Sequence, residues 1–138
     1  MIAKFNNIFL LTIYLIHFVG VGIYAFQTIL GTKGFMKKFG IDKSGTIMVR
    51  LAGAFMLAVF LMSIYIAFIR PAGLDSTWAF FNLVFLNNLC IFLCNFYSIK
   101  VDKTGVNKKT GTEPIISPMV LTIMSAILCY GLADKIYV

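Results

Sequence analysis

The sequence has little charge, and this scarcity limits what kind of protein it is. Only 12% of its 138 residues are charged, whereas about a quarter of the residues in soluble domains are. Hydrophobic residues make up 60%, and the mean hydropathy is +0.93. These values exclude an ordinary soluble domain and predict that most of the chain lies in lipid.

Acidic residues are absent from the middle of every long apolar run. The five that occur lie in connections or near the ends of runs: Asp42, Asp75, Asp102, Glu113 and Asp134. This placement gives no support to paired-acid catalysis, a carboxylate proton relay or a di-iron carboxylate site. There is also no apparent Ser-His-Asp grouping. We therefore expect that the protein is not an enzyme.

Cysteine is limited to three residues, and no CxxC pair occurs. Cys90 and Cys94 are one helical turn apart and Cys129 lies in the next apolar run, so a thiol cluster with His17 stays open as a hypothesis. Such soft ligands suit Cu(I) or zinc. We favour the simpler interpretation, because cysteines at membrane depth usually behave as small apolar residues. We therefore expect no metal and no cofactor.

Four apolar runs are long enough to cross a bilayer, at residues 5–30, 46–69, 77–99 and 118–133. A hydrocarbon layer of about 30 Å needs about 20 helical residues, and lipid cannot satisfy the open edge of a strand. The first run is too long for the apolar part of a secretory signal, and we expect it to be retained. The sequence thus predicts an all-α, integral membrane four-helix bundle that forms a single transmembrane domain over residues 1–138.

Glycine and proline separate these runs and suggest where helices begin. Ser117 followed by Pro118 predicts an N-cap and the first residue of the fourth helix, because proline has no amide proton to lose there. Asp75, Ser76 and Thr77 are alternative caps for the third helix.

Basic residues gather in two of the three connections, which together with the helix-entry Arg50 account for nine of the twelve: Lys33, Lys37, Lys38, Lys43, Arg50, Lys100, Lys103, Lys108 and Lys109. Because Lys and Arg near span ends are retained on the cytoplasmic side, loops 31–45 and 100–117 are predicted there, with both termini opposite. This basic rim would attract anionic lipid headgroups, although ordinary topology charge explains it as well. A nucleic-acid partner is not expected, because no recognition module accompanies the lysines.

Polar residues in the apolar runs fall on narrow helical faces and define the candidate interior. Helices hide such groups from lipid, because an unpaired polar group in hydrocarbon is costly. His17 and the pair Asn87-Asn88 lie near the middle of their spans, so they are candidates to hydrogen-bond each other or to line a pocket. The candidate residues for ligand binding or helix packing are Tyr14, His17, Tyr24, Arg50, Asn87, Asn88, Asn95 and Ser125.

Two further patterns concern helix packing and chain duplication. Ala54-x-x-x-Ala58 predicts a close contact between helices, because small residues let backbones approach. The segment at 41–45, Ile-Asp-Lys-Ser-Gly, is echoed at 101–105 by Val-Asp-Lys-Thr-Gly. A duplicated hairpin would produce this echo, and so would repeated use of common turn residues.

One segment resembles a known family. A short loop that ends in Phe39-Gly40-Ile41, followed by a helix that opens with Arg50-x-x-Gly53, is similar to the DoxX-like small four-helix membrane proteins of bacteria. The resemblance covers about forty residues. It implies a four-helix architecture and transfers no catalytic residue.

Two classes of function fit these observations. The leading hypothesis is a non-catalytic accessory or structural subunit of a larger membrane complex, since no soluble domain or catalytic grouping is apparent. The alternative is a small-solute or lipid carrier or pore, oligomeric and using a polar interior around His17, Asn87 and Asn88. Expected partners are the lipid bilayer and other membrane subunits or further copies of the chain.

Overall fold

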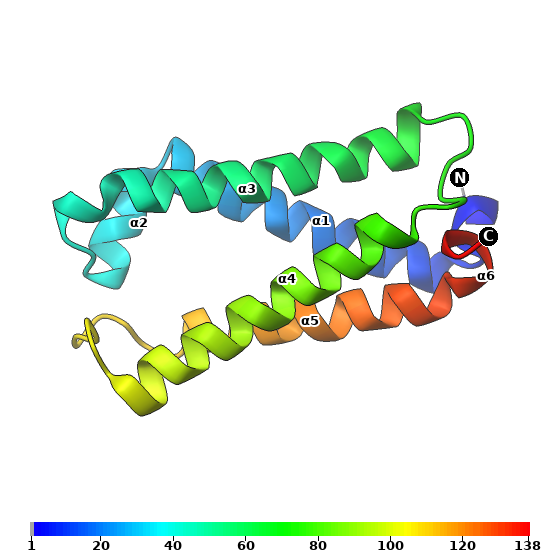
Figure 1. The fold of residues 1–138 in the computed structure, drawn as a ribbon. Coiled ribbons are helices and arrows are strands. Elements are labelled where there is room, and N and C mark those ends of the chain that lie inside the picture. Colours follow the sequence, from blue (N-terminus) through cyan, green and yellow to red (C-terminus); the bar gives the residue numbers. More distant parts are fainter. Residues whose placement is uncertain (1) are drawn as a thin grey trace.

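The computed structural model describes residues 2–138, with side chains from residue 4 onward, and every secondary-structure element in that range is a helix (Figure 1). The elements are η1 (Ile2–Phe5), α1 (Ile8–Ile29), α2 (Thr32–Phe39), η2 (Lys43–Gly45), α3 (Thr46–Ile64), η3 (Tyr65–Ile69), α4 (Trp78–Phe96), η4 (Tyr97–Asp102), α5 (Glu113–Gly131) and α6 (Ala133–Ile136). The segments η3 and η4 continue α3 and α4 as π-helix. The predicted all-α class is confirmed.

Four helical segments are long and apolar enough to span a membrane. They cover Ile8–Ile29, Lys43–Ile69, Trp78–Asp102 and Glu113–Gly131. This agrees with the four predicted spans and with a multi-pass membrane protein. α1 is the central helix, because 44% of its span is buried inside the protein, compared with 17–22% for the other three.

The fourth span begins earlier than the sequence predicted. α5 starts at Glu113, with Pro114 in its first turn, and Pro118 lies inside the helix. The proposed N-cap at Ser117 is therefore wrong. The physical reason is that Pro114 already fills the position where a proline is tolerated, so the helix forms one turn upstream. The third span begins at Trp78, after Thr77, whose side chain does not cap the helix.

The helices associate as two adjacent pairs joined through α1. α1 packs along α3, α4 packs along α5, and α1 also contacts α5, whereas α3 and α4 have little contact. Figure 1 shows both termini at one end, with α2 and the α4–α5 connection at the other. The two lysine-rich connections therefore lie at the same end, where Lys38 Nζ and Glu113 Oε1 form an ion pair of 2.7 Å.

Glycine, and not alanine, provides the close contact between α1 and α3. A Cβ at Gly53 would overlap the Thr28 hydroxyl, and one at Gly22 would lie 2.9 Å from the Phe60 ring. Ala54 and Ala58 are both exposed on the outer side of α3. The predicted Ala54-x-x-x-Ala58 contact within the bundle is therefore wrong, because α3 is rotated so that Gly53 faces its neighbour.

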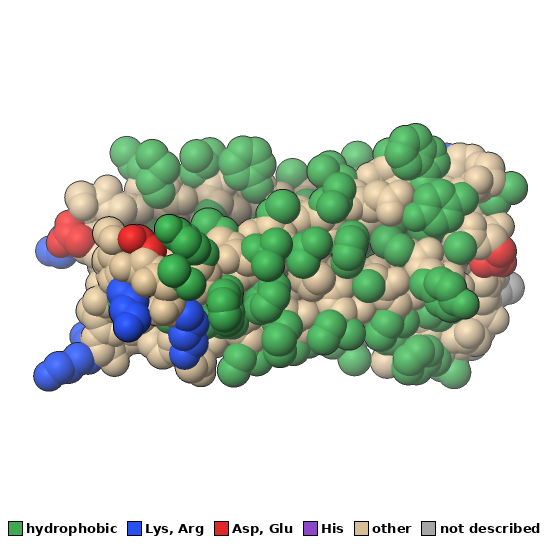
Figure 2. Space-filling view, turned by 60° about the horizontal axis from the view of Figure 1, so that its bottom comes forward, with side chains coloured by type: hydrophobic (Ala, Val, Ile, Leu, Met, Phe, Trp, Pro, Cys, Tyr) green, Lys and Arg blue, Asp and Glu red, His purple; other side chains and the backbone are tan. Residues whose placement is uncertain are grey.

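The two ends of the surface differ in charge. Figure 2 shows hydrophobic side chains over most of the visible face and basic side chains gathered at one end.

At that end the two segments of similar sequence, 41–45 and 101–105, adopt different conformations. Asp42 caps the short helix η2, whereas Lys103 ends η4 with a positive φ of 60°.

Candidate functional site

A polar cluster joins three helices near the middle of the bundle. It consists of His17 on α1, Asn88 on α4 and Ser125 on α5, whose exposed fractions are 0%, 2% and 2%. Asn88 Nδ2 lies 3.0 Å from His17 Nε2 and 3.4 Å from Ser125 Oγ. Ser125 also donates to Leu121 O at 2.8 Å within its own helix. The structure thus brings together three residues that the sequence singled out on separate helices.

The hydrogen bond from Asn88 indicates which ring nitrogen of His17 carries the proton. Asn88 Nδ2 faces three acceptors, because Leu121 O lies at 3.4 Å in addition to the His17 and Ser125 atoms. With an amide N–H directed at it, His17 Nε2 carries no proton, so a neutral imidazole carries its proton on Nδ1. That Nδ1 is buried and has no hydrogen-bond partner among the described residues. An orphaned buried donor of this kind costs about 1–3 kcal/mol.

The cluster is enclosed by the helices that it joins. His17, Asn88 and Ser125 are each at most 2% exposed, and they line neither the hollow between α4 and α5 nor the hollow at the α3–α4 connection. The amide, imidazole and hydroxyl are used to hydrogen-bond one another and a helix carbonyl. In this arrangement their chemistry is suited to holding α1, α4 and α5 together, since interhelical hydrogen bonds and close packing drive helix association in lipid.

Asn95 satisfies a carbonyl that a proline leaves free. Pro118 has no N–H, so the carbonyl of Pro114 four residues earlier lacks its usual helical donor. Asn95 Nδ2 on α4 donates to Pro114 O at 2.7 Å. Sequence reasoning named Asn95 but could not assign this partner, because it placed the start of the helix at Pro118.

The remaining candidate residues lie apart from the cluster. Tyr14 is 2% exposed and donates to Ser63 O of α3 at 2.7 Å. Tyr24 is 39% exposed and packs edge-on against Phe35 of α2. Arg50 is exposed and donates to Thr32 Oγ1 at 3.2 Å. These three residues therefore take part in helix packing at other points of the bundle, which is one of the two roles expected for the candidate residues.

Asn87 differs sharply from its neighbour Asn88. It is only partly buried, and its side chain makes no hydrogen bond to any described residue. One residue along a helix corresponds to a rotation of about 100°, so the two amides face different surroundings. The sequence placed both on one polar face, and the structure separates them.

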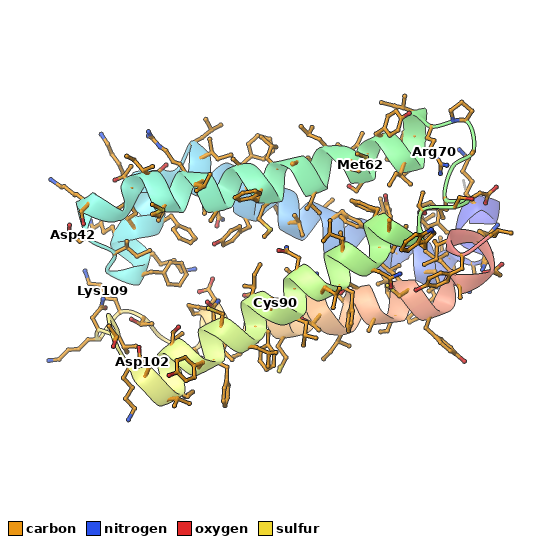
Figure 3. The ribbon with its side chains drawn as sticks, viewed as in Figure 1. Asp42, Met62, Arg70, Cys90, Asp102 and Lys109 are labelled. Atoms are coloured by element: carbon orange, nitrogen blue, oxygen red, sulfur yellow. The ribbon has the colours of Figure 1, made fainter. Side chains whose placement is uncertain are left out.

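The three cysteines do not form a metal centre with His17. Cys90 and Cys94 are exposed on α4 and Cys129 is half-buried on α5. Within residues 2–138, no group of three or more His, Cys, Asp or Glu side chains is placed to hold a metal ion. Figure 3 labels Cys90 near the middle of α4, where the residue is exposed.

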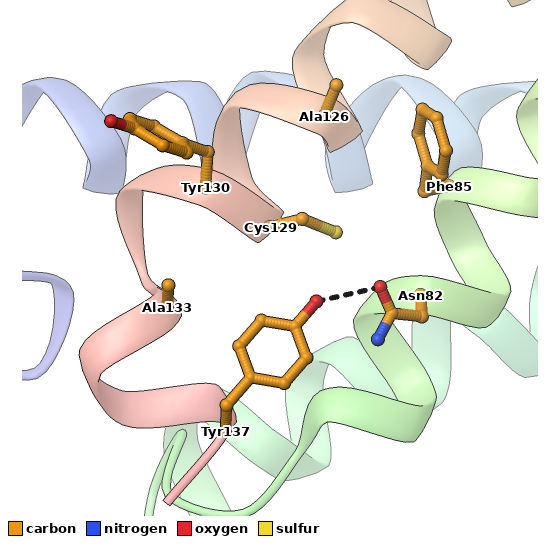
Figure 4. A pocket seen from close by; sticks show the side chains of 7 residues that line it. All are labelled: Asn82, Phe85, Ala126, Cys129, Tyr130, Ala133 and Tyr137. Carbon is orange, nitrogen blue, oxygen red and sulfur yellow. Dashed lines mark hydrogen bonds between the residues drawn. The ribbon is translucent and has the colours of Figure 1, made fainter.

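A hollow of about 330 Å³ lies between α4 and α5 near the termini. Figure 4 shows the residues that line it. Among them, Tyr137 OH donates a hydrogen bond of 2.9 Å to Asn82 Oδ1. The other hollow, of about 300 Å³, lies at the α3–α4 connection beside Lys4 and Lys135. Sequence reasoning missed Asn82 and Tyr137. The sequence pattern that could have indicated this hollow is the single asparagine, Asn82, early in the third apolar run.

Comparison with known proteins adds no relative. No protein-family model, curated protein or solved structure matches the chain.

Proposed function

We propose that this chain is a non-catalytic subunit that packs against other proteins within a larger membrane complex. One observation carries the proposal: the polar cluster of His17, Asn88 and Ser125 is enclosed and bonded within itself. Residues that could have bound a ligand are instead engaged in holding three helices together. A rigid bundle of this kind is suited to a structural role.

The distribution of buried surface supports the same role. Only 17–22% of the residues in the spans that contain α3, α4 and α5 are buried by the rest of the chain. Most residues of these spans therefore expose some surface to lipid or to other membrane helices. Small residues on that surface, such as Ala54 and Ala58, allow a neighbouring backbone to approach closely.

The charge distribution supports an orientation for the subunit. Eight lysines lie in or beside α2, η2, η4 and the α4–α5 connection, at the end opposite the termini. By the preference of basic residues for the cytoplasmic side, we place this end there and both termini on the other side. The same lysines would contact anionic headgroups of the inner leaflet.

Membership of the DoxX-like proteins stays a prediction, and the proposed subunit role does not depend on it.

A carrier or pore that uses His17, Asn87 and Asn88 is the alternative, and the geometry favours it less. Solute movement through the bundle would require the His17–Asn88 contact to open, because the two side chains are only 0% and 2% exposed. Such a protein would carry a solute flux that depends on both side chains.

The test is gentle detergent extraction from native membranes, followed by a native gel and mass spectrometry of each band. The expected result is stoichiometric co-migration with other membrane proteins, lost in a denaturing detergent. Migration only as a monomer or as a homo-oligomer would contradict the subunit role. Liposome flux assays of wild type and of the His17→Phe variant then test the carrier.

A further inference from the structure

An unpaired amide lies near the middle of a membrane span. Asn87 is the tenth residue of the span Trp78–Asp102, and its side chain has no hydrogen bond within the described chain. Hydrocarbon offers no donor or acceptor, so a polar side chain at this depth favours association with another helix that supplies one. Asn88, one residue away, already has its partners inside the bundle.

Asn87 belongs to a regular seam on the outer side of α4 and η4. The seam repeats at alternating spacings of four and three residues, which is the pattern of a helix that packs against a second helix. Its members are Leu83, Asn87, Cys90, Cys94, Tyr97 and Val101. Leu83, Tyr97 and Val101 are 66%, 58% and 60% exposed, and both cysteines are exposed as well.

Unpaired charges of opposite sign stand at the basic end of this seam. Lys100 and Asp102 flank Val101, both are exposed, and neither makes an ion pair with a described residue. Figure 3 labels Asp102 at that end of the yellow-green helix. A partner helix with the same two charges at the same depth would complement them.

We propose that two copies of this chain pair through the α4–η4 seam, about a two-fold axis along the membrane normal. The axis brings the two Asn87 side chains to the same depth, where each amide donates to the carbonyl oxygen of the other. Lys100 of one copy then faces Asp102 of the second. Cys90 and Cys94 are small enough to let the two backbones approach, and they face their own equivalents across the axis.

This pairing goes beyond the proposed function and does not depend on it. A dimer can enter a larger complex or exist outside one. The pairing of two copies involves the outer face of α4, whereas the buried cluster of His17, Asn88 and Ser125 involves its inner face. Either proposal can therefore be wrong while the other is right.

The first experiment is oxidative cross-linking of the native thiols in native membranes, read on a non-reducing gel. The wild-type chain of 15.4 kDa is expected to give a band at twice that mass. The double variant Cys90→Ser/Cys94→Ser should lose the band, and Cys129→Ser should keep it. The matched control is Leu93→Cys in that double variant, because Leu93 is 53% exposed on α4 but lies off the seam.

The second experiment measures the strength of pairing by fluorescence energy transfer in liposomes over a range of lipid-to-protein ratios. Asn87→Leu removes both reciprocal hydrogen bonds and should raise the dissociation constant about 8- to 300-fold, the range expected for two interhelical hydrogen bonds. Leu93→Ala should leave it unchanged.

Several outcomes would overturn the pairing. A monomer at every dilution would mean that lipid alone covers the seam, and a cross-link only to a different protein would assign the seam to another partner. A Leu93→Cys cross-link as strong as that of the native thiols would show random collision. The subunit role is judged separately, by co-migration with other proteins, so the two failures are distinguishable.

Discussion

The two sides of α1 are held to their neighbours by different forces. Against α3, the close approach depends on shape, because Gly53 and Gly22 leave room for Thr28 and the Phe60 ring, and Tyr14 OH adds one hydrogen bond to Ser63 O. Against α4 and α5, it depends on hydrogen bonds, because Asn88 lies between His17 and Ser125. In lipid the hydrophobic effect does not distinguish inside from outside, so helices must associate by one of these two means. Shape and hydrogen bonding therefore predominate in contacts of one helix with different neighbours.

The shape-dependent contact should be broken by a single added methyl group. Gly53→Ala places a methyl group on the Thr28 hydroxyl, which already donates to Tyr24 O at 2.8 Å and cannot move freely. Such overpacking costs about 1–3 kcal/mol. Unfolding in mixed micelles should show this loss, whereas Gly20→Ala, with nothing within 4 Å of the new carbon, should show none. Equal stability of the two variants would contradict a steric contact between α1 and α3.

The hydrogen-bonded side can be measured with a double-mutant cycle. Asn88→Leu should destabilise the fold by about 1–3 kcal/mol, because it leaves His17 Nε2 buried without its donor. Combining it with His17→Phe should recover part of that loss, with a coupling of about 0.6–1.7 kcal/mol in the same assay. A coupling of zero would mean that the two side chains are merely adjacent.

A smaller effect should link Asn95 to Pro118. Asn95→Leu removes the donor to Pro114 O and should cost about 0.5–1.5 kcal/mol. In a Pro118→Ala background the helix supplies its own N–H to that carbonyl, so the same substitution should cost less. If Asn95→Leu costs the same in both backgrounds, the side chain does not compensate for the proline.

The smallest expected effect concerns the echoed loops at the basic end. The backbone N–H of Ser44 donates to Asp42 at 2.9 Å and holds the pKa of the Asp42 carboxyl below its ordinary value. Stability from this cap is therefore present at neutral pH and lost as the pH falls through that lowered pKa. An NMR titration should place the Asp42 midpoint below that of an unstructured peptide of the same sequence. An equal midpoint would mean that the cap is absent.

Much of the architecture could be predicted, because lipid imposes strong constraints on composition and length. Long apolar runs predicted four spans, and the lysine-rich connections do lie together at one end. The start of the last helix was misplaced because two prolines, Pro114 and Pro118, both suit a first turn. A local pattern could not decide between them.

The sequence by itself predicted a membrane protein with four spanning helices and most of its positive charge in two connections. It could do so because hydropathy and charge are properties of whole segments. Only the tertiary structure decided which individual side chains are paired. Asn88 is bonded and Asn87 is not, and Gly53 is in contact while Ala54 is exposed. Neighbouring residues on a helix differ by about 100° in direction. Since lipid and protein interior are equally apolar, hydropathy cannot reveal which of those directions faces another helix.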